Sequence, residues 1–212
     1  MARSRRKPPT AQELAAAQEA EEFLRHYLAA APASLKRLRE RSAATGGPTE
    51  DKLDFGRDSL VPLFEWAMEQ FKLRPEDAPK EFVDKGEAGR FYQPLGGEQP
   101  MWYGRTGVSS PDWWDDDTLA LIDGLTYYFA EAVIRAVPDA HWEVGHHPTL
   151  KRWWHENQPM ILGAGEPFEP LQGMFAVASG VYRRIKPDPD NPRAAKPATV
   201  LDLQNWYDAV VA

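Results

Sequence analysis

A stripe of apolar residues between Leu121 and Ala136 constrains the fold more than any other feature of the chain. Its members recur at the spacing of one helix face: Leu121, Ile122, Leu125, Phe129, Ala132, Val133 and Ala136. Three consecutive aspartates, beginning at Asp115, precede the stripe and complement the positive end of a helix dipole, while Pro138 ends it. We therefore predict a long central helix whose apolar face is buried.

Two short apolar segments follow this helix, and their composition is typical of β-strands. They cover residues 141–146 and 159–163 and are joined by a turn rich in histidine and tryptophan. Two further helices are predicted at residues 59–74 and 170–186, where apolar side chains recur at helical spacing. Strands and helices do not alternate along the chain as they do in a doubly wound fold. We therefore expect the α+β class, with helices packed on a small antiparallel sheet.

Breaks in composition divide the chain into three regions. Residues 1–47 are predicted to form a basic N-terminal arm with two helices, because a capping box opens the first and Pro32 ends it. Residues 48–186 would form the α+β core domain. Residues 187–212 combine a proline-rich linker with a C-terminal docking helix.

Two segments of the core domain carry weaker signals. Residues 52–55 are predicted to form a short edge strand before a turn at Gly56. Residues 74–111 are rich in proline and glycine and show no regular period. Aromatic residues within this segment, Trp102 among them, predict that it packs against the body of the domain.

The charge of the chain is unevenly distributed. The formal net charge is −7, yet residues 1–44 hold nine lysines and arginines against five glutamates. A basic arm of this kind, residues 3–41, could contact nucleic acid, and the alternative is a solvated arm that aids solubility. The remainder of the chain is strongly acidic and would suit a basic partner.

Absent residues and motifs exclude several classes of function. Without cysteine the chain has no disulfide, no thiolate metal site and no cysteine nucleophile. No apolar run approaches the ~20 residues of a membrane span, and no apolar stretch of a secretory signal follows the basic N-terminus. Neither a glycine-rich phosphate loop nor a G-x-S-x-G nucleophile elbow is present. We expect a cytoplasmic protein without a cofactor and without a membrane partner.

Four of the five histidines lie close together in the sequence: His141, His146, His147 and His155. Imidazole nitrogens bind zinc, nickel or copper, and three that converge would suffice. His146 and His147, however, are adjacent and would point to opposite faces of a strand, and no helical H-x-x-x-H pair is present. We therefore predict a surface turn between two strands and no metal.

Tryptophans and acids cluster before the central helix. Clustered carboxylates can bind calcium, but the spaced ligands and glycine of a calcium-binding loop are missing, and helix capping explains the acids. Exposed tryptophan and tyrosine near arginine mark protein interfaces, because such side chains dominate binding energy. A second tryptophan pair lies on the histidine-rich turn. We predict partner contact by Trp113, Trp114, Asp115, Asp116, Trp153 and Trp154.

Glu131 and Arg135 are four residues apart on the central helix and therefore share one face. A glutamate buried in a cleft would have a raised pKa and could act as an acid or base, with Arg135, His141 and His155 as candidate companions. The alternative, which we favour, is an ion pair where the helix meets the sheet.

Four short segments of the chain follow a recognisable layout. They are Leu53-Asp54-Phe55-Gly56-Arg57-Asp58-Ser59-Leu60, the helical residues 124–135 with Tyr128, Glu131 and Arg135, the strand His141-Trp142-Glu143-Val144, and Gln158-Pro159-Met160-Ile161. This layout resembles a loose family of small bacterial domains, uncharacterised or of immunity-protein type, with the pattern L-D-x-S-x-x-S-L, then Y-x-G-E-V-x-x-R, then W-E-V. Gly56 replaces a serine of that pattern, and Ala130 replaces a glycine. The resemblance implies an α+β fold and a protein-binding role, and it assigns no catalytic residue.

Three functions remain open from the sequence. We favour a non-enzymatic, protein-binding factor of immunity or accessory type, whose acidic body steers a basic partner such as a toxin. The first alternative is an enzyme or small-ligand-binding domain that uses Glu131 and the histidine-rich turn. The second is a nucleic-acid-associated protein that binds through the basic arm.

Overall fold

The computed structural model of the chain describes residues 10–84, 90–94, 99–103, 111–146, 155–188, 190–191 and 195–212, with side chains left out between residues 80 and 98 and at residue 111. Within these ranges lie five α-helices and two small antiparallel sheets. The expected α+β class is confirmed. None of the described helices is both long and apolar enough to cross a membrane.

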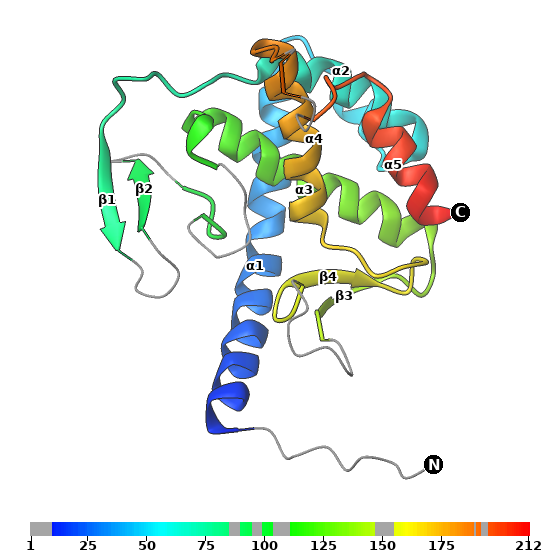
Figure 1. Ribbon diagram of the computed structural model, residues 1–212. Helices are drawn as coiled ribbons and strands as arrows, with labels where there is room; N and C mark the ends of the chain where they lie inside the picture. Colours follow the sequence, from blue (N-terminus) through cyan, green and yellow to red (C-terminus); the bar gives the residue numbers. More distant parts are fainter. Residues whose placement is uncertain are drawn as a thin grey trace.

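Helix α3 (Asp116–Ala136) is the centre of the molecule. It contacts α1 (Ala11–Ala44), α2 (Leu60–Gln70), α4 (Pro170–Ile185) and α5 (Asp202–Val211). Figure 1 shows α3 enclosed between α1 and α4, with α5 beside its C-terminal half. Because neighbours surround it, its residues from 118 to 130 are buried almost without interruption, apart from Ala120.

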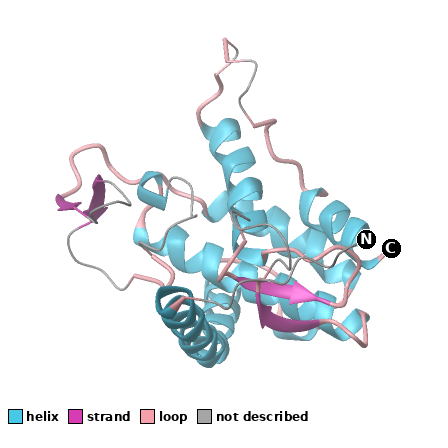
Figure 2. Cartoon of the chain, turned by 60° about the horizontal axis from the view of Figure 1, so that its bottom comes forward, coloured by secondary structure: helices cyan, strands magenta, loops and turns pink. Residues whose placement is uncertain are grey.

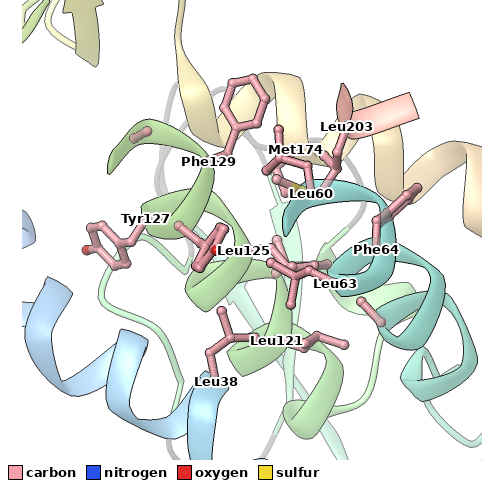
Figure 3. Packing of buried hydrophobic residues seen from close by; sticks show 14 of the residues in the cluster. Leu38, Leu60, Leu63, Phe64, Leu121, Leu125, Tyr127, Phe129, Met174 and Leu203 are labelled. Atoms are coloured by element: carbon pink, nitrogen blue, oxygen red, sulfur yellow. The ribbon is translucent and has the colours of Figure 1, made fainter. Parts of the chain in front are cut away.

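The core forms where the apolar faces of these helices meet. Figure 3 shows side chains from α2, α3, α4 and α5 in mutual contact, among them Leu63, Phe64, Leu125, Met174 and Leu203. Every apolar position predicted on α2 is buried, and on α3 only Ala136 of the predicted stripe is exposed. Helical spacing therefore identified the inward faces correctly.

The predicted strand pair is present. Strand β3 (His141–Val144) pairs antiparallel with β4 (Pro159–Leu162), and Trp142 lies opposite Ile161. Trp142 packs edge-on against Tyr27 of α1, with ring centroids 5.6 Å apart. This sheet therefore rests on the long N-terminal helix.

A second sheet was not predicted. Strands β1 (Lys80–Asp84) and β2 (Arg90–Pro94) form an antiparallel hairpin within the segment that shows no regular period in the sequence. The hairpin stands at one side of the helical body (Figure 1, Figure 2). The end of the same segment does pack inward, as expected, because Trp102 is fully buried.

The prediction of two helices in the N-terminal arm is wrong. A single helix of 34 residues, α1, runs through Pro32. The capping box is confirmed, because the Thr10 hydroxyl and the Glu13 carboxylate each accept a backbone hydrogen bond from the other residue. Pro32 lies on the exposed side of the helix, where water can satisfy the carbonyl freed by its missing N–H. The region boundaries at residues 47 and 186 stay predictions.

The predicted edge strand at residues 52–55 is also wrong. The chain instead forms two short 3-10 helices, η1 (Glu50–Lys52) and η2 (Arg57–Ser59), separated by a bend. Phe55 in this bend has a φ of 64°, a left-handed conformation that no strand residue adopts. The C-terminal docking helix is present as α5, where Trp206 stacks on Phe129 with ring centroids 3.9 Å apart.

Candidate functional site

Trp113 lies at the surface, as the predicted contact surface requires. The short helix η4 (Pro111–Trp113) precedes α3 and leaves the indole 38% exposed. Its ring stacks on Tyr182 of α4, with centroids 4.3 Å apart and planes 29° from parallel. A large aromatic side chain is thus held in a defined orientation while part of it remains accessible.

Trp114 does not belong to that surface. It is 1% exposed and packs edge-on against Phe71 and Tyr182. Trp114 pairs with Leu73 through an antiparallel backbone bridge, whereas Trp113 is the last residue of the short helix η4. Tyr182 therefore contacts both rings, but of the two only Trp113 stays accessible, and Trp114 is corrected from a contact residue to a core residue.

The two predicted aspartates have structural partners. The Asp115 carboxylate accepts a hydrogen bond of 2.8 Å from the backbone N–H of Thr118 and so caps α3. Asp116 Oδ1 accepts hydrogen bonds from Arg74 at 2.7 Å and from Gln99 at 2.9 Å. Both side chains remain partly exposed, and their contact with a partner stays a prediction. Trp153 and Trp154 lie outside the described residues.

A small polar cluster beside Asp116 escaped the sequence reasoning. Arg74 Nε, Gln99 Oε1 and the hydroxyl of Tyr103 are buried and have no hydrogen-bond partner within the described part of the chain. Burial raises the pKa of Tyr103 to about 12, against the opposing effect of the Arg74 charge. Sequence gives no sign of this cluster because its members come from separate segments.

Glu131 and Arg135 form the ion pair that we favoured. Arg135 Nε donates to Glu131 Oε1 at 2.8 Å, and both side chains are more than one-third exposed. His141 instead contacts the Asp139 carbonyl at 2.8 Å and Glu143 at 3.2 Å, and these contacts raise the pKa of His141.

His155 has a different acid as its partner. Its Nδ1 lies 3.1 Å from Glu169 Oε2, and both side chains are at least three-quarters buried. In the described ranges, then, the hydrogen-bonding partners of His141 and His155 do not include Glu131. No group of three or more histidine, aspartate or glutamate side chains that could hold a metal is found among those residues.

The structure brings together two of the segments that carry the family layout, residues 53–60 and 124–135. The backbone N–H of Phe55 donates to the Tyr128 hydroxyl at 3.0 Å, and that hydroxyl lies 2.7 Å from Ser59 Oγ. The Ser59 hydroxyl also donates to the Gly56 carbonyl at 2.6 Å. Tyr128 and Ser59 are both buried, so these bonds fix the bend against α3.

Aromatic stacking and two cations hold the ring of Phe55. Tyr128 stacks on it with centroids 4.6 Å apart. The guanidinium carbon of Arg135 lies 4.0 Å from the ring centroid, and that of Arg39, from α1, lies 5.3 Å from it. Left-handed backbone costs a non-glycine residue roughly 1–2 kcal/mol. These contacts offset that cost and keep Phe55 in place.

A buried carboxylate joins three parts of the molecule. Asp123 of α3 accepts hydrogen bonds from Ser34 of α1 and, at 2.7 Å, from Trp102 Nε1. Arg37 lies 3.8 Å away from the same carboxylate. Burial raises the pKa of Asp123, while the bonds from Ser34 and Trp102 act in the opposite direction. Because its carboxylate accepts hydrogen bonds from both Ser34 and Trp102, Asp123 joins α1 to α3 and has a structural role.

Comparison with known proteins finds no match for this chain or for its fold. No protein-family model matches the chain, no curated protein matches its sequence, and no solved structure matches its fold. The resemblance to immunity-type domains therefore stays a prediction from the four short segments.

Proposed function

We propose that the protein binds another protein through a surface centred on Trp113. This surface, the Trp113 face, consists of Trp113, Tyr182, Ile185, Asp112 and Asp117. The observation that carries the proposal is the partly exposed indole stacked on Tyr182. Tryptophan and tyrosine supply much of the binding energy at protein interfaces, because they bury large apolar areas with few rotatable bonds.

The stacked ring favours binding on entropic grounds as well. A side chain that is ordered before the partner arrives loses less conformational freedom on binding. Trp114 helps to keep the Trp113 ring ordered, because it is buried beside Trp113 and packs on the same Tyr182 ring. The indole of Trp113 is therefore held between a rigid core and the solvent.

The surroundings of the indole suit a basic partner. Ile185 follows Tyr182 by three residues on α4, and its side chain is 42% exposed. Residues 112–117 carry four aspartates and no cation, and Asp112 and Asp117 are exposed. On the α4 side the rim also carries a cation, because the Arg183 guanidinium lies 5.5 Å from the Tyr182 ring centroid. The acidic side formed by residues 112–117 is therefore the part of the rim that would meet basic groups of a partner. A toxin neutralised by an immunity-type protein is the partner that the sequence resemblance suggests.

The contacts of Glu131 support this proposal over the enzyme alternative. The carboxylate is paired with Arg135 at the surface, and the contacts found for His141 and His155 are to other groups. A hollow of about 380 Å³ does open beside Gly47, Pro62 and Trp66, but Glu131 does not line it. A general base must lie beside a site that is large enough for a substrate, and this hollow is not beside Glu131.

The test compares Trp113→Ala with two matched variants, Leu14→Ala and Leu201→Ala, which also truncate exposed apolar side chains but on other elements, at the start of α1 and just before α5. Each immobilised protein is used to capture partners from a cell lysate. A protein retained by wild type and by both controls is then purified and titrated by calorimetry.

We expect Trp113→Ala to weaken its binding by about 2 kcal/mol, which is roughly 30-fold. Raising the salt concentration should also slow association, because the rim is charged. The proposal fails if Trp113→Ala binds the purified partner as tightly as the control variants do, while circular dichroism shows that it remains folded.

A further inference from the structure

We propose that Arg39 and Arg135 form a binding site for an oxyanion, a carboxylate or phosphate group, beside the ring of Phe55. This site lies apart from the Trp113 face and does not depend on it. The starting observation is that two cations from different helices approach one aromatic ring, with guanidinium carbons 5.3 Å and 4.0 Å from its centroid.

The acids within reach neutralise this pair of cations only in part. Glu131 binds Arg135 through Nε at 2.8 Å. Glu50 lies 3.9 Å from Arg39, but its side chain is 82% exposed, and such a pair is weak in water. Asp54 is also near, yet its carboxylate turns back to accept a hydrogen bond from the backbone N–H of Gly56. Each arginine therefore has an acid of its own, and among the described residues no single carboxylate is found that bridges the two cations.

Donors remain free at both arginines. Arg39 Nε is buried and has no hydrogen-bond partner among the residues that the structure describes. In the same ranges, the Nη groups of Arg135 make no hydrogen bond, since only its Nε is engaged by Glu131. A guanidinium carries five N–H donors in a fixed fork that matches the paired oxygens of carboxylate and phosphate. An oxyanion bound to the accessible Nη groups of Arg135 would add a negative charge beside both cations.

The platform under the arginines is rigid. Phe55 holds a left-handed backbone, and its N–H is bound by Tyr128. Two hydrogen bonds of 2.6 Å join Arg57 to Asp208 and tie the bend to α5. Strained backbone that is fixed from several sides is concentrated at ligand sites, because it keeps a surface in one shape. Stacking on Phe55 likewise restricts the planes of the guanidinium groups.

The test follows the Nε–Hε resonances of Arg39 and Arg135 by NMR during titration with sodium phosphate and, separately, with sodium acetate. Sodium chloride at matched ionic strength is the reference. We expect saturable shifts at both arginines. Saturation with phosphate alone assigns a phosphate group, saturation with acetate alone assigns a carboxylate, and saturation with both assigns a general oxyanion site.

Variants separate specific binding from general charge. Arg39→Gln and Arg135→Gln should each weaken binding by about tenfold or more, since each removes a charged hydrogen-bond donor. Arg25→Gln is the matched control, because Arg25 lies on the same helix as Arg39, is exposed and pairs with Glu22. The proposal is overturned if neither anion gives saturable shifts, or if Arg25→Gln weakens binding as much as the other two. Arg135 is half-exposed, so its variant stays informative even if Arg39→Gln unfolds.

Discussion

The hydroxyl of Tyr128 offers a sharp test of how the Phe55 bend is held. Tyr128→Phe removes one oxygen atom and leaves the ring that stacks on Phe55. That oxygen accepts the backbone N–H of Phe55 and contacts Ser59 Oγ. Because Phe55 is 6% exposed, its N–H would then be buried without a partner.

The expected cost follows from that unpaired donor. Leaving a buried N–H unsatisfied costs about 1–3 kcal/mol. Ser59 contributes little to the loss, since its hydroxyl still donates to the Gly56 carbonyl. For a protein of this size each kcal/mol lowers the melting temperature by about 2–4 °C. The αL backbone of Phe55 would also lose one of the contacts that keep it there.

Urea unfolding, followed by far-ultraviolet circular dichroism, measures the difference. Tyr207→Phe is the matched control: Tyr207 is also buried, and no hydrogen bond of its hydroxyl is found in the described part of the chain. The control should change the free energy of unfolding by less than about 0.5 kcal/mol. If Tyr128→Phe is as stable as Tyr207→Phe, the hydroxyl does not hold the bend and our account of Phe55 is wrong.

Two further predictions concern the middle and the N-terminus of α3. Burial raises the pKa of Asp123 in the folded protein above its value in the unfolded chain. The bound proton therefore stabilises the folded protein fully at pH values below the unfolded pKa, and this stabilisation is lost as the pH rises through the folded pKa. Asp123→Asn cannot ionise, and we expect its stability relative to wild type, measured by urea unfolding at a series of pH values, to increase as the pH rises above the ordinary pKa of an aspartate; a constant difference would contradict this. Asp115→Ala should lose about 1 kcal/mol in thermal unfolding, because the Thr118 N–H loses its cap, whereas Asp115→Asn should lose much less.

Periodic features of the fold could be predicted from the sequence. The apolar stripes of α2, α3 and α4 specify helices because one face of each is buried along its whole length. The strand pair β3–β4 could also be predicted, because each strand is a short apolar run bounded by turn residues. In each case the local pattern and the tertiary contacts agree.

Features set by distant contacts could not be predicted. The left-handed bend at Phe55 depends on Tyr128, which is 73 residues away. Pro32 lies inside a helix because the packing of α1 on α3 stabilises both sides of it. Trp113 and Trp114 are chemically identical neighbours, and the tertiary contacts of Trp114 with Leu73 and Phe71 distinguish the buried ring from the exposed one.

Helix α5 has a consequence for the order in which the protein folds during synthesis. Trp206 covers Phe129 in the centre of the molecule, and Asp208 binds Arg57 across 151 residues. The bend at Phe55 and the face of α3 therefore lack their cover until residue 208 has been made. While the ribosome works through the intervening residues, the nascent chain exposes an apolar surface that only its own late segment fills. We therefore expect the helical core to reach its final packing only after α5 has been made.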